Sequence, residues 1–185
     1  MALTKTPVCD FGKKAEDFKL KSINNKVITL NDIKGEKATL IMFICNHCPY
    51  VKAIIKDLAK DCNELRNDGI NSVAIMSNDT KNYPEDSFEN MIKFAENNNF
   101  GNMNYLLDET QEIAKKYGAV CTPDFFGYNK DLKLQYRGRF RELKDLKPIN
   151  NGNSDLKVAM KKVAQTQKGP DEQIPSMGCN IKWFN

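Results

Sequence analysis

Three features that would point to a membrane, a secretory route or a nucleic-acid partner are missing from this sequence. No apolar run among its 185 residues approaches the ~18 residues that a membrane-spanning helix requires. The first residues, Met1 to Val8, lack the continuous apolar core and the cleavage pattern of a secretory signal. The net charge of +4 is small, so it does not indicate nucleic-acid binding. We therefore expect a cytoplasmic protein that binds neither membranes nor nucleic acids.

Cysteine is also scarce, and most of the cysteines lie far apart in the sequence. The chain has six of them, too few for a scaffold held together by disulfides: Cys9, Cys45, Cys48, Cys62, Cys121 and Cys179. Only Cys45 and Cys48 form a close pair, which in a reducing compartment indicates redox catalysis or a metal site. Zinc requires four ligands and there is no second Cys-x-x-Cys, although Cys121, His47 and Cys179 could join the pair in the fold. We expect neither a metal nor another cofactor.

The cysteine pair lies at the junction between a predicted strand and a predicted helix. The apolar run from Thr39 to Ile44 predicts a buried strand, and it leads into Cys45-Asn46-His47-Cys48-Pro49. From Pro49 onward the apolar residues follow helical spacing, and proline is tolerated in the first turn of a helix. The amino end of a helix carries partial positive charge, which favours a thiolate over a thiol. His47, the only histidine, is expected to stabilise the Cys45 thiolate further.

The remaining pattern predicts one α/β domain over residues 1–185. Strands and helices alternate in the first half, which implies a parallel central unit, and two later strands form an antiparallel hairpin. An N-terminal β-hairpin precedes this unit, residues 147–153 are expected to form a polar loop, and residues 169–185 an irregular C-terminal tail packed on the domain. The predicted strands are 18–20, 27–30, 39–44, 70–76, 105–107, 124–128 and 132–136, with helices after residues 48, 84, 109 and 153.

Four motifs, in this order along the chain, resemble a known family. They are Gly12-x-x-Ala15-x-Asp17-Phe18, Phe43-Ile-Cys-Asn-His-Cys-Pro-Tyr-Val51, Thr122-Pro-Asp-Phe125 and Gly178-Cys-Asn-Ile-Lys-Trp183. The chain is similar to redoxins of the thioredoxin fold, and more narrowly to a peroxiredoxin-like group of the alkyl hydroperoxide reductase and thiol-specific antioxidant superfamily. The resemblance implies a thioredoxin-like fold of the peroxiredoxin type, with a central mixed β-sheet flanked by helices.

The chain departs from the peroxiredoxin pattern at the positions that would activate a peroxide. By the resemblance, Cys48 corresponds to the peroxidatic cysteine, but Ile41 and Cys45 stand where that motif has a proline and a hydroxyl residue. The supporting arginine is replaced by Thr122-Pro123, with the arginines at 137 and 139 left as spatial substitutes. A Cys-x-x-Cys thus stands in place of the peroxidatic motif, which favours disulfide exchange over peroxide reduction.

We expect a thiol–disulfide oxidoreductase in which Cys45, as the more exposed sulfur, attacks a substrate disulfide. Cys48 then attacks Cys45 in the mixed disulfide and releases the reduced substrate. The substrate is a protein or small-molecule disulfide or dithiol, and the reductant is a thiol system such as thioredoxin or glutathione. Two alternatives remain open. One is a thiol peroxidase with antioxidant activity, in which Cys48 is peroxidatic and Cys45 resolving, and the other is a redox-inert binding or sensor module.

The resemblance also implies roles for residues around the cysteine pair. Pro123 is expected to be a cis proline facing the pair, which would leave the backbone of Thr122 open to an extended substrate. Asn46 is expected to contact the substrate with them. Cys121 borders this turn, and the segment around Cys179 could dock over the site, so both are further candidates for a redox role. The chain is expected to act as a monomer or a homodimer.

Overall fold

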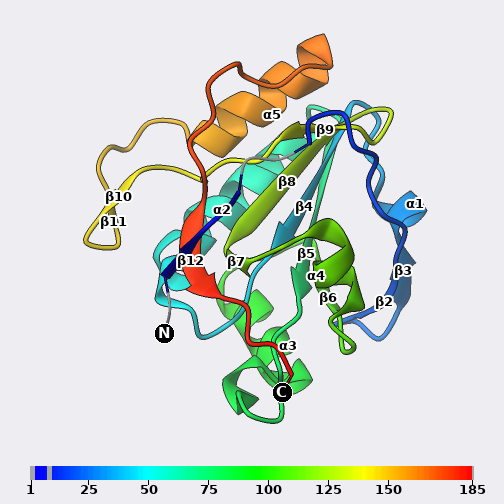
Figure 1. The fold of residues 1–185 in the computed structure, drawn as a ribbon, viewed down its shortest axis with the longest axis vertical. Coiled ribbons are helices and arrows are strands. Elements are labelled where there is room, and N and C mark those ends of the chain that lie inside the picture. Colours follow the sequence, from blue (N-terminus) through cyan, green and yellow to red (C-terminus); the bar gives the residue numbers. More distant parts are fainter. Residues whose placement is uncertain (1–2, 8–9, 185) are drawn as a thin grey trace.

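The computed structural model describes residues 3–7 and 10–184 of the chain (Figure 1). Cys9 lies outside these residues. The helical elements are α1 (Leu30–Ile33), α2 (Pro49–Arg66), the 3₁₀ turn η1 (Pro84–Asp86), α3 (Phe88–Asn97), α4 (Glu112–Tyr117) and α5 (Asp155–Thr166). The strands are β1 (Leu3–Lys5), β2 (Lys19–Ser22), β3 (Val27–Thr29), β4 (Ala38–Phe43), β5 (Ile70–Met76), β6 (Asn104–Leu107), β7 (Cys121–Thr122), β8 (Asp124–Asn129), β9 (Leu134–Tyr136), β10 (Leu143–Lys144), β11 (Lys147–Pro148) and β12 (Met177–Asn180).

A seven-stranded mixed sheet forms the centre of the fold, with the strand order β3-β2-β6-β5-β4-β8-β9. The strands β4, β5 and β6 are parallel, as the alternation of strands and helices predicted. The late hairpin of β8 and β9 extends the sheet on one side, and the N-terminal hairpin of β2 and β3 extends it on the other. The predicted thioredoxin-like arrangement, a central mixed sheet flanked by helices, is thereby confirmed.

Helices cover both faces of this sheet, because successive side chains of the buried central strand point to opposite faces. On β4, Leu40 and Met42 pack into a core with α2 and α5, whereas Ile41 and Phe43 pack into a second core with α1 and α4. The buried side chains of α2 form one stripe at helical spacing: Val51, Ile54, Ile55, Leu58, Ala59, Asp61, Cys62 and Leu65. Burial of this stripe packs α2 against β5 and α5.

The C-terminal segment is largely irregular, as expected, but it contains the strand β12. In Figure 1, β12 lies between β1 and β7, with which it forms a three-stranded antiparallel sheet. The segment predicted as a polar loop likewise begins with the two-residue strand β11, which pairs with β10. Neither strand was visible in the sequence, because both are short and their pairing depends on the tertiary fold. Within the described part of the chain, no helix is both long and apolar enough to cross a membrane.

Candidate active site

The cysteine pair follows β4 and opens α2, as the sequence predicted. Pairing with β5 continues past β4, since the amide of Ile44 donates to the carbonyl of Ile75. Cys48 is the N-cap residue of the 18-residue helix α2, so it lies at the positive end of the helix dipole. Both thiols are buried, with 1% of Cys45 and 0% of Cys48 exposed. The greater exposure that we expected for Cys45 is therefore absent from this structure.

Thr122 contacts both sulfur atoms of the pair. Its hydroxyl Oγ1 lies 3.3 Å from Cys45 Sγ, and its carbonyl oxygen lies 3.1 Å from Cys48 Sγ. The Thr122–Pro123 peptide bond is cis, which confirms the prediction for this turn. Although 74 residues separate Thr122 from Cys48, the antiparallel pairing of β8 with β4 brings the turn against the cysteines.

Cys179 of the tail is the third thiol of the site. Its Sγ lies 3.0 Å from Cys48 Sγ, and β12 pairs Cys179 with Thr122. The tail therefore does dock over the cysteine pair. The backbone edge of Thr122, which we expected to be open for a substrate, is occupied by β12 instead. No disulfide links the five cysteines that the structure describes.

Cys121 lies beside the site but is not hydrogen-bonded to the cysteine pair. Its Sγ is directed at the carbonyl oxygen of Pro123, 3.5 Å away. Burial raises the pKa of Cys121 far above that of an ordinary thiol, and the nearby carboxylate of Asp124 acts in the same direction. A buried thiol that resists ionisation is a poor nucleophile. The structure thus offers little support for a redox role of Cys121.

A buried carboxylate that the sequence analysis did not identify, Asp86, organises the loop between the two cysteines. Its Oδ1 accepts hydrogen bonds from the backbone amides of Asn46, at 2.7 Å, and His47, at 3.3 Å. Its Oδ2 lies 2.7 Å from His47 Nδ1 and accepts a hydrogen bond from Asn78 Nδ2 at 2.8 Å. Asp86 follows Asn46 by 40 residues, so no local sequence pattern links it to the cysteine motif.

His47 is held between Asp86 and the ring of Tyr83, on which it stacks with 5.7 Å between ring centroids. The hydrogen bond with Asp86 raises the pKa of His47, although partial burial opposes this shift. One ligand atom each of Cys45, His47 and Asp86 lies within 4.8 Å of the others, a spacing that a metal ion could bridge. However, His47 Nδ1 and both Asp86 oxygens already have hydrogen-bond partners, and three ligands are fewer than structural zinc requires. The cluster is better suited to holding the loop in place.

The three thiols of the site differ strongly in acidity. The hydrogen bond with Cys48 raises the pKa of Cys45 well above that of an ordinary thiol, and burial and the Asp86 charge add to this. The hydrogen bond from Cys45 lowers the pKa of Cys48 to about 5; burial opposes the shift and the Cys179 thiol supports it. Burial and the contact with Cys48 raise the pKa of Cys179 to about 12. Of the three thiols, Cys48 is therefore the one whose ionisation the site favours.

This distribution of charge favours Cys48, and not Cys45 as we expected, as the attacking sulfur. The physical reason is where each thiol lies relative to the nearby charges. Cys48 caps the positive end of α2, whereas Cys45 lies close enough to Asp86 for the carboxylate to disfavour a second negative charge. One contact acts against the Cys48 thiolate. The carbonyl oxygen of Thr122, 3.1 Å from Cys48 Sγ, can accept a hydrogen bond from the thiol but not from the thiolate, so this contact favours the protonated form.

The ultraviolet absorbance of the Cys48 thiolate should appear with a midpoint near pH 5, because the pKa of this thiol is lowered to about 5. The other thiols should ionise in a separate step at higher pH, near or above the ordinary value of ~8.5. In Cys45→Ala the Cys48 step should move to higher pH, because the hydrogen bond from the Cys45 thiol is lost. Cys62→Ser serves as the control and should leave the step in place. A wild-type titration with no thiolate below pH 7 would contradict the assignment of the charge to Cys48.

The side chains of Asn46, Arg137 and Arg139 bind other parts of the protein and form no hydrogen bonds with the sulfurs of the cysteines that the structure describes. Asn46 is buried, donates to the carbonyl of Glu85 and accepts a hydrogen bond from the hydroxyl of Tyr105. It therefore anchors the loop and has little surface left for a substrate. Arg137 pairs with Asp124 at 3.0 Å, and Arg139 pairs with Asp155 at 2.6 Å. Neither guanidinium is hydrogen-bonded to Cys48, so neither replaces the arginine that a peroxiredoxin uses.

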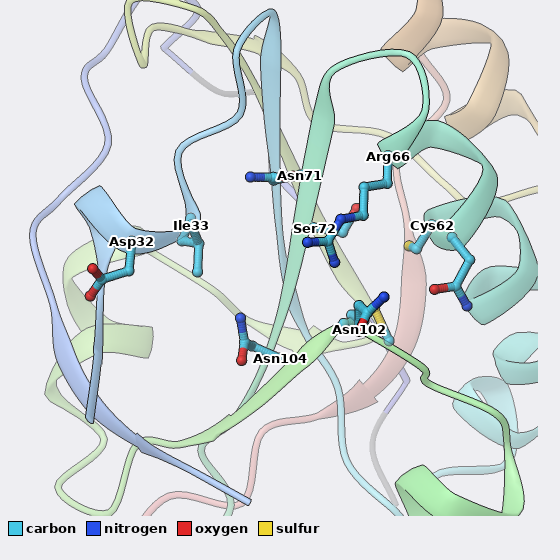
Figure 2. A pocket seen from close by; sticks show the side chains of 10 residues that line it. Asp32, Ile33, Cys62, Arg66, Asn71, Ser72, Asn102 and Asn104 are labelled. Carbon is cyan, nitrogen blue, oxygen red and sulfur yellow. The ribbon is translucent and has the colours of Figure 1, made fainter. Parts of the chain in front are cut away.

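A small cavity of about 80 Å³ lies at the opposite end of α2 from the cysteine pair. Figure 2 shows its lining, which includes Arg66 at the end of α2 and Ser72 of β5. Cys62 also lies here, and burial raises its pKa to about 12. This cysteine is therefore a core residue, as the sequence predicted, and provides a matched control for substitutions at the site.

A strand followed by two cysteines, a helix capped by the second of them and a cis-proline turn against both define a thioredoxin-fold redox protein. A family model described as AhpC/TSA family matches residues 11–137. The chain belongs to this family. Membership indicates thiol redox activity, either of the disulfide-exchange or of the peroxiredoxin-like kind. A comparison with functionally curated proteins found no match.

Solved structures share the fold over most or all of the chain. An uncharacterized conserved protein from Geobacillus kaustophilus is 42% identical, with a TM-score of 0.89 over 100% of this chain and 97% of that one. A hypothetical protein from Sinorhizobium meliloti is 36% identical, with a TM-score of 0.90 over 98% of each chain. The thioredoxin domain of a thiol-disulfide oxidoreductase from Bacteroides vulgatus is 19% identical, with a TM-score of 0.59 over 70% of this chain and 89% of that one. This last similarity establishes the thioredoxin fold.

Proposed function

We propose that the protein is a thiol–disulfide oxidoreductase whose redox couple is Cys45 and Cys48. One observation carries this proposal: Thr122 lies against both sulfurs, 3.3 Å from Cys45 and 3.1 Å from Cys48. The hydrogen bond between the two thiols, through which each affects the pKa of the other, supports their assignment as one redox couple. The buried environment of the pair separates their acidities, which supplies one nucleophile and one proton donor.

The reaction begins when the Cys48 thiolate attacks one sulfur of a substrate disulfide. A bond forms between Cys48 and that sulfur, the substrate disulfide breaks, and the other half of the substrate leaves as a thiolate that takes up a proton. Cys45 then loses its proton and attacks the sulfur of Cys48, which releases the second half of the substrate as a thiol. The product is a Cys45–Cys48 disulfide, and two thiols of an external reductant restore the reduced pair.

The proposed partners follow from this chemistry. The substrate is a protein or small-molecule disulfide, or a dithiol if the cycle runs in reverse, and the reductant is a thiol system of the thioredoxin or glutathione type. We propose that the protein acts as a monomer or a homodimer in the cytoplasm, where both the substrate and the reductant are present. The hydrogen bonds of the buried Asp86 carboxylate with Asn46 and His47 support the site by fixing the loop between the cysteines. The hydrogen bond with His47 also raises the pKa of that histidine.

Trapping of the mixed disulfide tests the proposed function and the order of attack. Oxidised glutathione is the probe, and Cys179→Ser is included in both variants because this third thiol lies near the pair. In Cys45→Ser/Cys179→Ser, glutathione should accumulate on Cys48, as read by mass spectrometry of peptides. In Cys48→Ser/Cys179→Ser, Cys45 should stay unmodified because burial and the Asp86 charge still raise its pKa. Modification of Cys45 alone would reverse the order of attack, and modification of neither cysteine would contradict the proposed function.

The burial of Cys48 favours one second candidate, a thiol peroxidase that uses the same sulfur. A hydroperoxide is small enough to reach a thiol that a protein substrate cannot reach directly. Cys48 would attack the hydroperoxide, which releases an alcohol (or water from hydrogen peroxide) and leaves a sulfenic acid on Cys48. Cys45 would then form the disulfide with Cys48 and release water. Rates of hydrogen peroxide consumption and of disulfide reduction, measured for one preparation with one reductant, separate the two functions. A much larger rate with peroxide would favour the peroxidase.

A further inference from the structure

The strand β12 occupies the backbone edge beside the cis-proline turn. Its residue Cys179 is the register partner of Thr122 in the antiparallel pair of β12 with β7. The hydroxyl of Ser176, just before β12, donates to the carbonyl of Pro123 at 2.7 Å. An extended substrate that approached the cysteine pair along this edge would require the same backbone groups. The tail of the chain therefore already fills the place of such a substrate.

The packing of β12 on this turn is very close, and it depends on a glycine. A Cβ atom on Gly178 would lie 2.0 Å from the carbonyl oxygen of Thr122 and 3.1 Å from Cδ of Pro123. Contacts of 2.0 Å cannot be accommodated without moving the backbone, so only glycine permits this approach. The other edge of β12 is held by β1, where Leu3 is the register partner of Cys179. The sheet thus holds the strand from both sides.

This position of β12 places the sulfur of Cys179 directly against the sulfur of Cys48. The two Sγ atoms lie 3.0 Å apart, although 131 residues separate them in the sequence. Both side chains are buried, and no other side chain from the tail is hydrogen-bonded to Cys48 in the described structure. The sulfur of Cys179 therefore already lies beside the sulfur that would carry a mixed disulfide.

We propose that β12 is a built-in occupant of the substrate edge and that Cys179 is a second resolving thiol, which competes with Cys45 for a mixed disulfide on Cys48. This inference rests on the proposed function, because Cys48 must first react with a substrate disulfide. Cys179 then loses its proton and its sulfur bonds to Cys48, while the bond between Cys48 and the substrate sulfur breaks. The substrate half leaves as a thiol with that proton. Two protein thiols are oxidised, and one substrate disulfide is reduced to two thiols.

The two internal disulfides have different structural consequences. A Cys45–Cys48 disulfide joins neighbouring residues of one loop and leaves β12 unattached. A Cys48–Cys179 disulfide ties β12 to the first turn of α2 and keeps extended substrates away from the edge of β7 until a reductant opens it. The choice of resolving thiol therefore decides whether a protein substrate can still displace β12 from the edge of β7.

Oxidation of Cys45→Ser with diamide tests whether Cys179 pairs with Cys48. Diamide is a small azo compound that joins two adjacent thiols and is itself reduced to the hydrazine, so no prior reaction with a substrate is needed. Non-reducing peptide mapping should find residues 48 and 179 linked as the main product. In Cys62→Ser, the matched control at a buried cysteine outside the site, both the 45–48 and the 48–179 links should appear. If Cys48 and Cys179 both stay reduced in Cys45→Ser, the inference is wrong.

The same variants with oxidised glutathione separate failure of this inference from failure of the proposed function. Cys45→Ser should release glutathione and form the 48–179 link, whereas Cys45→Ser/Cys179→Ser should retain glutathione on Cys48. Stable glutathione on Cys48 in both variants overturns the resolving role of Cys179 and leaves the proposed function intact. Absence of any reaction with glutathione overturns the proposed function, and diamide still decides the pairing.

Gly178→Ala tests whether β12 covers the site. The added Cβ should displace the strand from Thr122, and alkylation of Cys48 by iodoacetamide should become about tenfold faster or more, because a buried thiol reacts through locally opened states. Gly152→Ala is the matched control, since its Cβ would meet only Asn150 Oδ1 at an ordinary 3.5 Å. Circular dichroism checks that both variants are folded. An unchanged alkylation rate in folded Gly178→Ala would show that β12 does not restrict access.

Discussion

Replacement of Cys48 with serine is expected to lower the rate of disulfide reduction by about 10³-fold or more, as loss of the nucleophile does in other enzymes with covalent intermediates. The reason is that Cys48 is the thiol of the site whose ionisation is favoured, with its pKa lowered to about 5. A serine hydroxyl is the same shape but does not ionise in this range. The measurement is steady-state reduction of a model disulfide with a dithiol reductant, and Cys62→Ser should retain the wild-type rate.

The matching result for Cys45 distinguishes the roles of the two cysteines. Cys45→Ser should still undergo the first half of the reaction, because its Cys48 remains able to attack. It should turn over more slowly, since one resolving thiol is missing. If Cys48→Ser retains activity while Cys45→Ser loses it, then Cys45 is the nucleophile, and the charge assignment of the two thiols must be exchanged.

Replacement of Arg137 with alanine is expected to destabilise the protein by about 3–5 kcal/mol, the usual cost of leaving one member of a buried ion pair without its partner. Arg137 Nη2 lies 3.0 Å from Asp124 Oδ2, and both side chains are almost completely buried. The same guanidinium donates to the carbonyl of Gly118 and stacks over the ring of Phe126. Burial already raises the pKa of Asp124 in the presence of this cation. Urea unfolding monitored by circular dichroism measures the loss.

Two controls make the Arg137 prediction specific. Arg139→Ala removes an arginine whose carboxylate partners, Asp155 and Glu142, are about half exposed, so it should cost about 1 kcal/mol or less. The double variant Arg137→Met/Asp124→Leu removes both charges and should be more stable than Arg137→Ala, because no unpaired carboxyl remains. Equal destabilisation by Arg137→Ala and Arg139→Ala would mean that the buried ion pair contributes no more to the free energy of unfolding than the exposed one.

The Arg137–Asp124 ion pair stabilises the fold next to the cysteine pair. Asp124 directly follows Pro123, and its carboxylate accepts a hydrogen bond from the amide of Val120. The pair therefore anchors both sides of the segment that carries Thr122, which contacts the two sulfurs. We infer that the arginine considered from the sequence as a support for peroxide instead holds the turn against which the cysteine pair packs.

Local patterns in the sequence determined the central part of this protein. The apolar run before Cys45, the proline after Cys48 and the helical spacing from Val51 onward correctly predicted a buried strand followed by a helix. The parallel strands and both hairpins were predicted as well. These features depend on the period of the apolar residues and on residues adjacent in the chain, so one stretch of sequence contains enough information to specify them.

Only the tertiary structure decided which sulfur carries the charge and what lies over it. Asp86 reaches the loop of Asn46 across 40 positions, and Cys179 reaches Cys48 across 131, while Arg137 finds its partner in Asp124 and not in the site. A pKa depends on burial, hydrogen bonds and nearby charges within a few ångströms. Because strand pairing between distant segments sets those distances, the acidities of Cys45, Cys48 and Cys179 could not be obtained from the order of the residues alone.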